Sequence, residues 1–311
     1  MIKFRSFCLV AATAVAAFVA GAAQAQTAPR TFVSGVGDDS NACSRTAPCK
    51  SFGGALAKTE EFGEVDCLDP GGFGFVTITK SVTIDCHEQV GSILNDGTAA
   101  ILVAFDSFEP NDRVKTVNLR NLTLQGTDNG SIGIHLTGVG AGTAVNIEDC
   151  LITNNLESPA GGIVDDRSRG MLTINNTTVR SSFANGILIS TSNGSVRAMI
   201  SNTRVINSNI GITAGPDANV VISHSIVSGN SVAGLVVQSG GTMIVDSTVI
   251  AHNGNGIQNA GTVELSNSDV TYNTTAVSGS VNSFSNNRFT KNTTLGTIIP
   301  IGTTSNPSGL Q

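Results

Sequence analysis

The stretch Ile200-Ser201-Asn202-Thr203-Arg204-Val205-Ile206 returns in recognisable form as Val221-Ile222-Ser223-His224-Ser225-Ile226-Val227 and as Glu264-Leu265-Ser266-Asn267-Ser268-Asp269-Val270. Each copy places an apolar residue three positions after an amide or imidazole side chain. Aligned on that residue, the repeats advance in steps of 28, 27, 26, 22, 22, 21 and 19 residues. The eight apolar anchors are Leu124, Ile152, Val179, Val205, Val227, Val249, Val270 and Phe289.

A repeat of about 20 to 30 residues is typical of a solenoid, in which each unit buries its apolar face against its neighbours. A leucine-rich repeat has a similar period, but its dense leucine pattern and helical segment are absent here. The units are rich in Val, Ile, Thr, Ser, Asn and Gly, which favours short strands and tight turns. Polar side chains that tolerate a left-handed backbone are therefore expected at one turn of every coil. They are Asn121, Asp149, Asn176, Asn202, His224, Asp246, Asn267 and Asn286.

The first 25 residues have the pattern of an export signal. Lys3 and Arg5 precede an apolar run over residues 7–20, and Ala23-Gln24-Ala25 offers a cleavage site between small residues. No later apolar run approaches the length of a membrane span. The sequence therefore predicts a signal peptide over residues 1–25 and a mature chain that is periplasmic or secreted and not inserted in a membrane.

The charge balance argues against two kinds of partner. Without Lys3 and Arg5 the chain keeps 15 basic residues against 23 acidic ones, a net charge of −8. Nucleic acid and anionic membrane surfaces are therefore not expected as the main partner. The chain contains no Trp and only one Tyr, Tyr272, so aromatic faces that could hold sugar rings are scarce.

Five cysteines remain after export, where disulfides are permitted. Cys67 and Cys86 end two similar strand-like runs 19 residues apart, so a bridge could join successive coils. Cys43 and Cys49 could close a small loop, and Cys150 is left over. A metal site is the alternative, but no Cys-x-x-Cys or His pair stands at ligand spacing. The sequence favours disulfides.

Residues 26–88 predict a cap followed by the first coils. Ser51 is a suitable helix N-cap, and Phe52, Ala55 and Leu56 fall on one helical face. A short helix there would cover the open end of the coil, which otherwise exposes strand edges and core. Residues 89–294 are expected to form the remaining coils, and residues 295–311 a second cap and a tail.

The opening of the chain resembles a known family. The succession Gly37-Asp38-Asp39-Ser40-Asn41, Pro48-Cys49-Lys50-Ser51-Phe52 and Asp69-Pro70-Gly71-Gly72-Phe73 resembles the start of right-handed parallel β-helix proteins of the pectin-lyase-like superfamily, and the repeats from Leu119 are similar to its coils. The resemblance implies an all-β fold, a single-stranded right-handed parallel β-helix with a short N-terminal capping helix.

The resemblance does not choose an activity. The superfamily includes polysaccharide lyases, glycoside hydrolases, epimerases, esterases, phage tailspikes and members without known chemistry. The Asn-Thr-Asp, Gly-His-Gly and Arg-Ile-Lys runs of polygalacturonase-like hydrolases, the Trp-x-x-Asp-His stretch of pectate lyases and the Tyr-Gly-x-Asp-Pro-His run of mannuronan epimerases are all absent. No catalytic residue can therefore be carried over from these enzymes.

The longer coils before Val205 suggest where a site could lie. Their extra residues fall within 155–170 and 181–197, which we expect to bulge as loops and to form a groove. The first loop carries the densest charge cluster of the chain, and its members are the candidate catalytic residues Asp165, Asp166, Arg167 and Arg169.

Paired carboxylates could serve as acid and base in glycoside hydrolysis, or could hold a cation while an Arg assists uronate elimination. The alternative is a solvated loop whose charges pair with one another. Arg180 and Arg204 flank their anchors on neighbouring coils and should point away from the core, which makes them candidate substrate-binding residues. No cofactor is expected, and calcium only if the protein is a lyase.

Three classes of function remain open. The favoured one is an exported β-helix protein that binds envelope or extracellular polysaccharide without catalysis. The second is a lyase or hydrolase of an acidic polysaccharide, and the third is a structural or adhesive rod.

Overall fold

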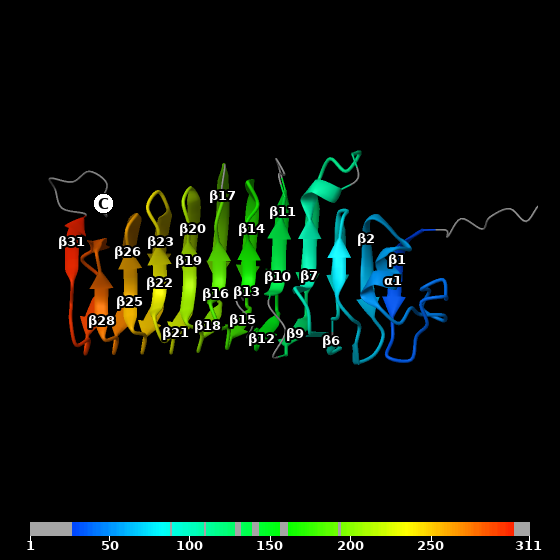
Figure 1. Cartoon of the computed structure of the whole chain (residues 1–311), viewed down its shortest axis with the longest axis horizontal. Coiled ribbons are helices and arrows are strands. Elements are labelled where there is room, and N and C mark those ends of the chain that lie inside the picture. Colours follow the sequence, from blue (N-terminus) through cyan, green and yellow to red (C-terminus); the bar gives the residue numbers. More distant parts are fainter. Residues whose placement is uncertain are drawn as a thin grey trace, which may run out of the picture.

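The computed structural model describes residues 27–87, 89–108, 110–127, 132–138, 143–155, 161–191 and 194–301, which wind into one elongated coil of strands (Figure 1). The chain visits three sheets in turn, so each full coil adds one strand to every sheet. Neighbouring strands come from successive coils and run parallel. The expected parallel β-helix is therefore confirmed.

Among the described residues the three sheets contain twelve, nine and ten strands, and we name them by these numbers. The twelve-stranded sheet consists of β1 (Ala28–Val33), β2 (Thr59–Cys67), β5 (Val82–Asp85), β8 (Thr116–Arg120), β11 (Ala144–Glu148), β14 (Arg169–Asn175), β17 (Ser195–Ser201), β20 (Ala218–Ser223), β23 (Thr242–Asp246), β26 (Thr262–Ser266), β29 (Ser280–Phe284) and β31 (Thr297–Ile301).

The ten-stranded sheet consists of β3 (Gly71–Gly72), β6 (Gly91–Asn95), β9 (Leu122–Gly126), β12 (Leu151–Thr153), β15 (Thr178–Arg180), β18 (Arg204–Ile206), β21 (Ile226–Ser228), β24 (Val249–Ala251), β27 (Asp269–Thr271) and β30 (Arg288–Thr290). The nine-stranded sheet consists of β4 (Val76–Ile78), β7 (Ala99–Ala104), β10 (Ile132–Thr137), β13 (Gly161–Asp165), β16 (Asn185–Ile189), β19 (Ile210–Ala214), β22 (Ala233–Val237), β25 (Asn255–Asn259) and β28 (Thr275–Ser278).

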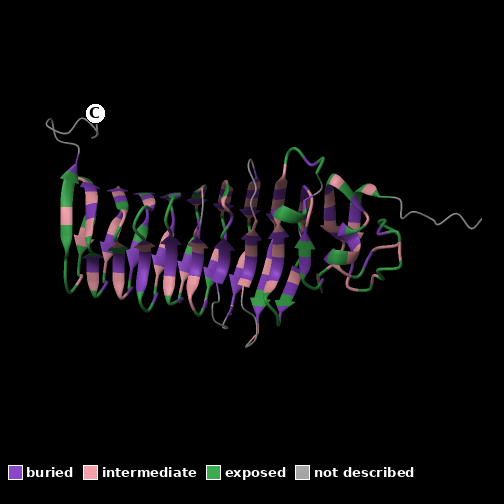
Figure 2. Cartoon of the chain, turned by 45° about the horizontal axis from the view of Figure 1, so that its top comes forward, coloured by how far each residue is buried: buried purple, intermediate pink, exposed green. Residues whose placement is uncertain are grey.

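Three corners join the sheets in every complete coil. The first corner leads from the twelve-stranded to the ten-stranded sheet, the second from the ten-stranded to the nine-stranded sheet, and the third back to the twelve-stranded sheet of the next coil. Strand side chains alternate between the interior and the outside. Buried and more exposed residues accordingly alternate along the strands in Figure 2. The interior is a continuous column of Val, Ile and Leu side chains.

The first corner turns on a single residue with left-handed backbone. The φ angle lies between 47° and 56° at Asn121, Asp149, Asn176, Asn202, His224, Ser247 and Asn267. These side chains also connect coils, since Asn121 Nδ2 donates to Asp85 Oδ1 at 2.7 Å and Asn202 Nδ2 donates to Asn175 Oδ1 at 3.0 Å. The polar ladder predicted from the repeat is therefore present, and His224 is one of its members.

One repeat lies a residue away from its predicted register. The core position after Val227 is Ile250, which is 0% exposed, whereas the predicted anchor Val249 is 37% exposed. The turn residue of this coil is accordingly Ser247, and Asp246 ends β23. The sequence Val249-Ile250 offers two apolar candidates in a row, and spacing alone selected the wrong one.

A buried ladder of hydroxyl groups follows the first corner. The backbone N–H of Thr203 donates to Ser225 Oγ at 3.2 Å, and that of Thr248 donates to Ser268 Oγ at 3.1 Å. Cys150 occupies the same position in its own coil, where its Sγ donates to the carbonyl oxygen of Glu148 at 3.2 Å. Burial raises the pKa of the Cys150 thiol to about 12. Cys150 therefore takes the place of a hydroxyl residue in this ladder.

A second buried ladder, which the sequence analysis missed, runs inside the second corner. Asn230 Nδ2 donates to Asn253 Oδ1 at 2.9 Å, and the same bond joins Asn253 to Asn273 and Asn273 to Asn292, at 3.0 Å each. The amide of Asn253 also donates to the carbonyl oxygen of Val227 at 3.1 Å. These asparagines satisfy backbone groups that the turn leaves without partners.

The N-terminal cap is also as predicted. Helix α1 (Phe52–Leu56) begins after Ser51, whose Oγ accepts a hydrogen bond from the Gly54 N–H at 2.9 Å. The helix buries Phe52, Ala55 and Leu56. Disulfides join Cys43 to Cys49 and Cys67 to Cys86, with Cα atoms 4.6 and 4.7 Å apart. The second bridge ties two successive coils of the twelve-stranded sheet together.

The asparagine ladder stops where serine replaces asparagine. Asn155 Nδ2 and Ser182 Oγ are buried without a hydrogen-bond partner. We predict that Ser182→Asn stabilises the protein by about 1 kcal/mol, because the longer amide can accept from Asn155 Nδ2 as Asn253 accepts from Asn230. Asn253→Ala should instead cost about 2 to 4 kcal/mol, since it leaves buried groups unpaired. Urea unfolding of both variants measures this, and a destabilised Ser182→Asn variant would contradict the role given to the ladder.

We predict that Cys67→Ala combined with Cys86→Ala lowers the unfolding free energy by about 3 kcal/mol, because the bridge constrains a loop of 19 residues in the unfolded chain. Cys150→Ser is the matched control and should cost about 1 kcal/mol or less, because serine already occupies this ladder at Ser225. Denaturant unfolding under non-reducing conditions compares the two, and equal stabilities would refute the prediction.

Candidate functional site

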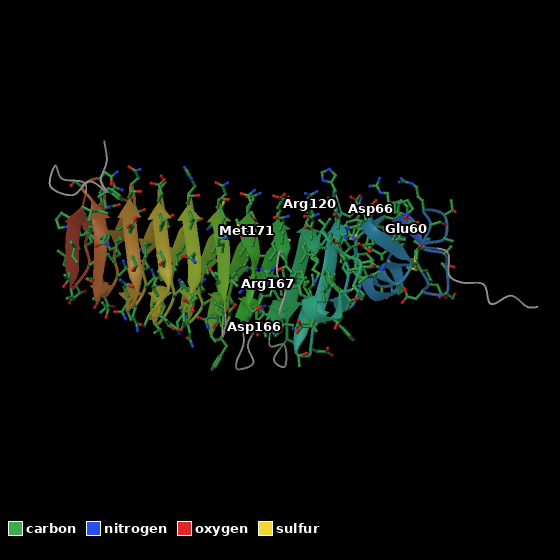
Figure 3. All side chains as sticks on the ribbon, turned by 90° about the horizontal axis from the view of Figure 1, so that it is seen from above. Glu60, Asp66, Arg120, Asp166, Arg167 and Met171 are labelled. Atoms are coloured by element: carbon green, nitrogen blue, oxygen red, sulfur yellow. A yellow bond between two sulfur atoms is a disulfide. The ribbon has the colours of Figure 1, made fainter. Side chains whose placement is uncertain are left out.

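The predicted charge cluster lies at the third corner and in the two strands that it joins. Strand β13 ends at Asp165 and β14 begins at Arg169, so the range expected to bulge as a loop contains two strands and a tight corner. In Figure 3, Arg167 lies among the strands and Asp166 near the edge of the coil. The corner therefore sends neighbouring charged side chains in opposite directions.

Asp165 and Arg167 form an ion pair inside the coil, where both are 0% exposed. Asp165 occupies the interior row between Leu136 and Ile189. Arg167 donates through Nε to Asp165 Oδ1 at 2.8 Å and through Nη2 to Asp165 Oδ2 at 2.6 Å. This bidentate geometry is the strongest form of an arginine–carboxylate pair.

The remaining faces of the Arg167 guanidinium are also occupied. Its Nη1 donates to Thr143 Oγ1 at 3.0 Å, its Nη2 donates to the carbonyl oxygen of Met171 at 3.3 Å, and its Cζ lies 5.1 Å from the centre of the Phe105 ring. A buried charge needs such complete pairing. The expectation that Asp165 and Arg167 share a groove with Asp166 and Arg169 is therefore wrong.

Asp166 points outward and pairs with His135, whose Nε2 lies 2.9 Å from Asp166 Oδ2. Partial burial would raise the pKa of the Asp166 carboxyl, but hydrogen bonding and the charge of His135 outweigh it and hold that pKa below its usual range. Asp166 is therefore an ionised, partly exposed carboxylate. Its predicted catalytic role stays a prediction.

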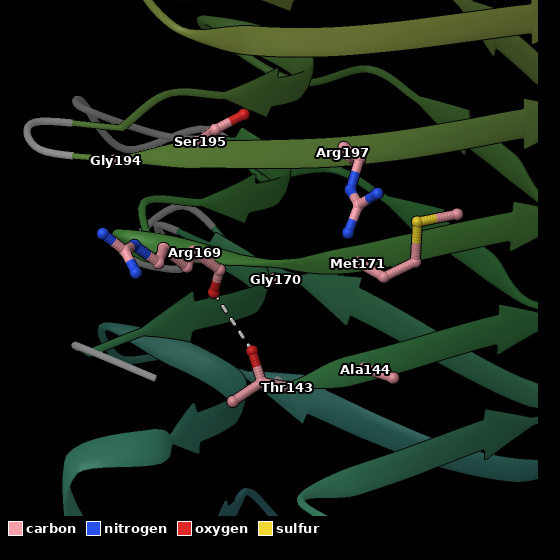
Figure 4. Close-up of a pocket in the computed structure, with 8 residues that line it drawn as sticks. All are labelled: Thr143, Ala144, Arg169, Gly170, Met171, Gly194, Ser195 and Arg197. Atoms are coloured by element: carbon pink, nitrogen blue, oxygen red, sulfur yellow. Dashed lines mark hydrogen bonds between the residues drawn. The ribbon is translucent and has the colours of Figure 1, made fainter. Parts of the chain in front are cut away.

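Arg169 borders the largest depression on the described surface, with a volume of about 770 Å³ (Figure 4). We call it the arginine pocket. It lies where β11, β14 and β17 begin, and Arg169, Met171 and Arg197 point into it, together with smaller residues Thr143, Ala144, Gly170, Gly194 and Ser195. Both arginines are exposed. The parallel register sets Arg169 beside Ser195 and Met171 beside Arg197.

The two guanidinium groups of the pocket belong to one site. Arg169 and Arg197 are offset by one strand and two residues, so their Cα atoms are about 8 Å apart, which long arginine side chains can span. Within the described part of the chain neither guanidinium has a hydrogen-bond or ion-pair partner, and no acidic residue lines the pocket. The site can therefore receive an anionic group.

Tight packing of the backbone shapes the pocket. A Cβ atom at Gly194 would lie 2.1 Å from the carbonyl oxygen of Ser168, and the φ angle of Gly194 is 132°. Thr143 Oγ1 donates to the carbonyl oxygen of Arg169 at 3.1 Å, as the dashed line in Figure 4 shows. The backbone around Arg169 is thus held in place from both neighbouring coils.

The sequence analysis did not select Arg197. The repeat could have found it, because the 26-residue step from Val179 to Val205 also carries Met171 to position 197. Arg180 and Arg204 do point outward on adjacent strands of the ten-stranded sheet, as predicted, where Arg204 lies beside Thr178. They occupy a different face from the arginine pocket, and their substrate-binding role stays a prediction.

Two searches of the described residues complete the inventory of sites. They contain no group of three or more His, Cys, Asp or Glu side chains placed to hold a metal ion. They also contain no helix that is long and apolar enough to cross a membrane.

Asp165→Asn should destabilise the protein by about 3 to 5 kcal/mol, because it leaves the Arg167 charge buried without a counter-charge. The neighbouring Asp166→Asn is the matched control and should cost about 1 kcal/mol or less, since its ion pair is partly exposed. Urea unfolding compares the two. The double variant Asp165→Leu with Arg167→Met should recover most of the loss, and an Asp165→Asn variant as stable as the control would contradict a structural role for the pair.

Comparison with known proteins supports the fold. The crystal structure of pectate lyase Pel9A superposes with a TM-score of 0.50 at 17% identity, over 86% of this chain and 72% of the other. That of the GH136 lacto-N-biosidase from Eubacterium ramulus gives a TM-score of 0.36 at 10% identity, over 87% and 66%. No curated protein sequence is similar enough to count as a relative.

The family model described as a right handed beta helix region matches residues 132–306, more than half of the 311 residues. This region includes most of the coils in which the three sheets and both buried ladders were described. The chain therefore belongs to the right-handed β-helix family.

Proposed function

We propose that the chain is an exported protein that binds an acidic polysaccharide of the cell envelope or its surroundings through the arginine pocket. The observation that carries the proposal is the pair of exposed, unpaired guanidinium groups of Arg169 and Arg197 at one depression, without an acidic residue among its described lining. This local positive site contrasts with the formal net charge of −6 for the chain.

The chemistry of arginine favours a carboxylate or sulfate ester as the bound group. A guanidinium is planar, always charged and able to donate two parallel hydrogen bonds to such an anion. Met171, Ala144 and the glycines give the pocket apolar surface against which the C–H groups of a sugar ring could lie. A uronic acid offers both features in one ring, an anionic carboxylate and apolar C–H groups.

Three further observations support an exported, glycan-binding protein. Residues 1–25 have the pattern of an export signal. The two disulfides suit an oxidising compartment. The β-helix fold is shared with pectate lyase Pel9A, a protein named for its action on an acidic polysaccharide. The fold presents a long regular surface along which a polymer could lie.

Binding without catalysis is favoured over a lyase or hydrolase. Glycoside hydrolysis needs two carboxyl groups about 5 to 9.5 Å apart on either side of the bond. Asp165 is closed inside the coil, and no carboxylate lies among the described residues that line the arginine pocket. A structural rod without a ligand is the remaining alternative.

We predict that the mature protein binds polygalacturonate and alginate more tightly than neutral glycans, and that Arg169→Ala and Arg197→Ala each weaken this binding roughly threefold to tenfold, because each removes a charge-assisted contact. Isothermal titration calorimetry measures the affinity. Raising the salt concentration should weaken binding, since exposed charges are screened.

Arg180→Ala and Arg204→Ala serve as the comparison variants, because both are exposed arginines on the ten-stranded sheet. Loss of binding in these two alone would move the site to the face predicted from the sequence. Absence of binding to any acidic glycan would favour the rod, and release of unsaturated or reducing products would show catalysis. Either result would overturn the proposal.

A further inference from the structure

The outside of the second corner carries a column of residues with left-handed backbone, one from each coil. Their φ angles lie between 55° and 71°, and the members are Asn154, Ser181, Asn207, Gly229, His252, Tyr272 and Lys291. Their side chains project from the corner, except at Gly229, which has none. The column therefore contains one gap, between Asn207 and His252.

Aromatic rings adjoin this gap on the side of the later coils. The rings of His252 and Tyr272 stack with centres 5.1 Å apart and an angle of 7° between their planes. Gly229 precedes His252 in the column, and its N–H donates to the carbonyl oxygen of Ala251 at 3.2 Å. The gap thus lies next in line to an exposed aromatic stack.

A depression of about 300 Å³ opens at the gap and extends over the two earlier coils. We call it the corner pocket. Its lining includes Phe183, Asn207, Asn209, Gly229 and Ser231, and no charged residue. Phe183 is 52% exposed, which is unusual for a large apolar ring surrounded by polar neighbours. The corner pocket therefore combines one open aromatic ring with amide and hydroxyl groups.

The polar groups of the corner pocket keep free hydrogen-bonding capacity. Ser231 Oγ donates to Asn209 Oδ1 at 2.7 Å, which fixes the Asn209 amide and leaves its Nδ2 without a partner among the described residues. The Asn207 side chain has no described hydrogen-bond partner and leans over the gap, since its Oδ1 lies 2.4 Å from where a Cβ of Gly229 would stand. Two amides can thus donate and accept at the same depression.

We propose that the corner pocket binds a neutral hexopyranose ring, as a second site separate from the arginine pocket. Sugar hydroxyl groups both donate and accept, which matches two amides and a serine hydroxyl. The apolar C–H face of the ring matches the open face of Phe183. The absence of charge in the lining favours a neutral sugar over a uronic acid. The proposal does not depend on the function assigned to the arginine pocket.

Two substitutions test the corner pocket without touching the core. Gly229→Asn places a side chain in the gap, and the backbone accommodates it because Asn154 and Asn207 occupy the same column with φ angles of 59° and 56°. Phe183→Ala removes the aromatic face. Val232→Ala is the matched control, because Val232 is 47% exposed at the same corner and does not line the pocket.

The measurement is saturation-transfer-difference NMR of the mature protein with the methyl glycosides of glucose, galactose, mannose and galacturonic acid. We expect transfer to the ring C–H protons of at least one neutral glycoside, reduced at least fivefold by Phe183→Ala and by Gly229→Asn and unchanged by Val232→Ala. Circular dichroism confirms that each variant is folded. Neutral signals that persist in both pocket variants, or no signal from any neutral glycoside, would overturn the proposal.

The same variants separate this proposal from the arginine pocket. Phe183→Ala should leave polygalacturonate binding unchanged, and Arg169→Ala with Arg197→Ala should leave the neutral glycoside signal unchanged. Loss of polygalacturonate binding in Phe183→Ala would show instead that the two pockets form one acidic site, which would contradict a separate neutral site.

Discussion

The structure depends on satisfying the backbone where each coil turns. A strand in the sheet finds partners in the coils before and after it, but a corner residue with left-handed backbone does not automatically do so. At the first corner this need is met by polar turn residues and by the hydroxyl ladder behind them. At the second corner it is met by the buried asparagines, each of which bonds to the next coil and to the backbone. The apolar column fills the space between these ladders.

This constraint also explains where specific surfaces arise. The ladders require nearly the same residue in every coil, so they leave little freedom for recognition. Freedom exists at outward positions and where a corner lacks its usual side chain. The arginine pocket lies at the start of three outward-facing strands, and the corner pocket lies where Gly229 interrupts a column of larger residues. Both pockets are therefore local departures from the repeat.

The fold could be predicted from the sequence because its determinants repeat. The turn residues, the anchors and the capping helix at Ser51 are set by local chemistry at a regular spacing. The register failed at Val249, where two apolar residues in a row satisfy the spacing equally well and only packing decides for Ile250. The buried asparagines were missed because asparagine is common in exposed turns, and nothing in the sequence marks Asn253 as interior.

The candidate site was predicted less well, for a physical reason. A run of charged residues looks uniform in sequence, but strand alternation turned Asp165 and Arg167 into the interior, where they pair with each other, and left Asp166 outside. Arg197 joined Arg169 only through the register between β14 and β17. Side chains that act together in a coil are one repeat apart, so a local cluster is a poor guide to a site.

The central claim is that Arg169 and Arg197 form a binding site for an acidic glycan. A crystal structure of the mature protein with a bound galacturonate oligomer tests it most directly. The account predicts a carboxylate of the oligomer within hydrogen-bond distance of both guanidinium groups, about 2.7 to 3.2 Å, on the outer face of β14 and β17. An oligomer bound on the ten-stranded sheet near Arg180 and Arg204, with the arginine pocket empty, would contradict it.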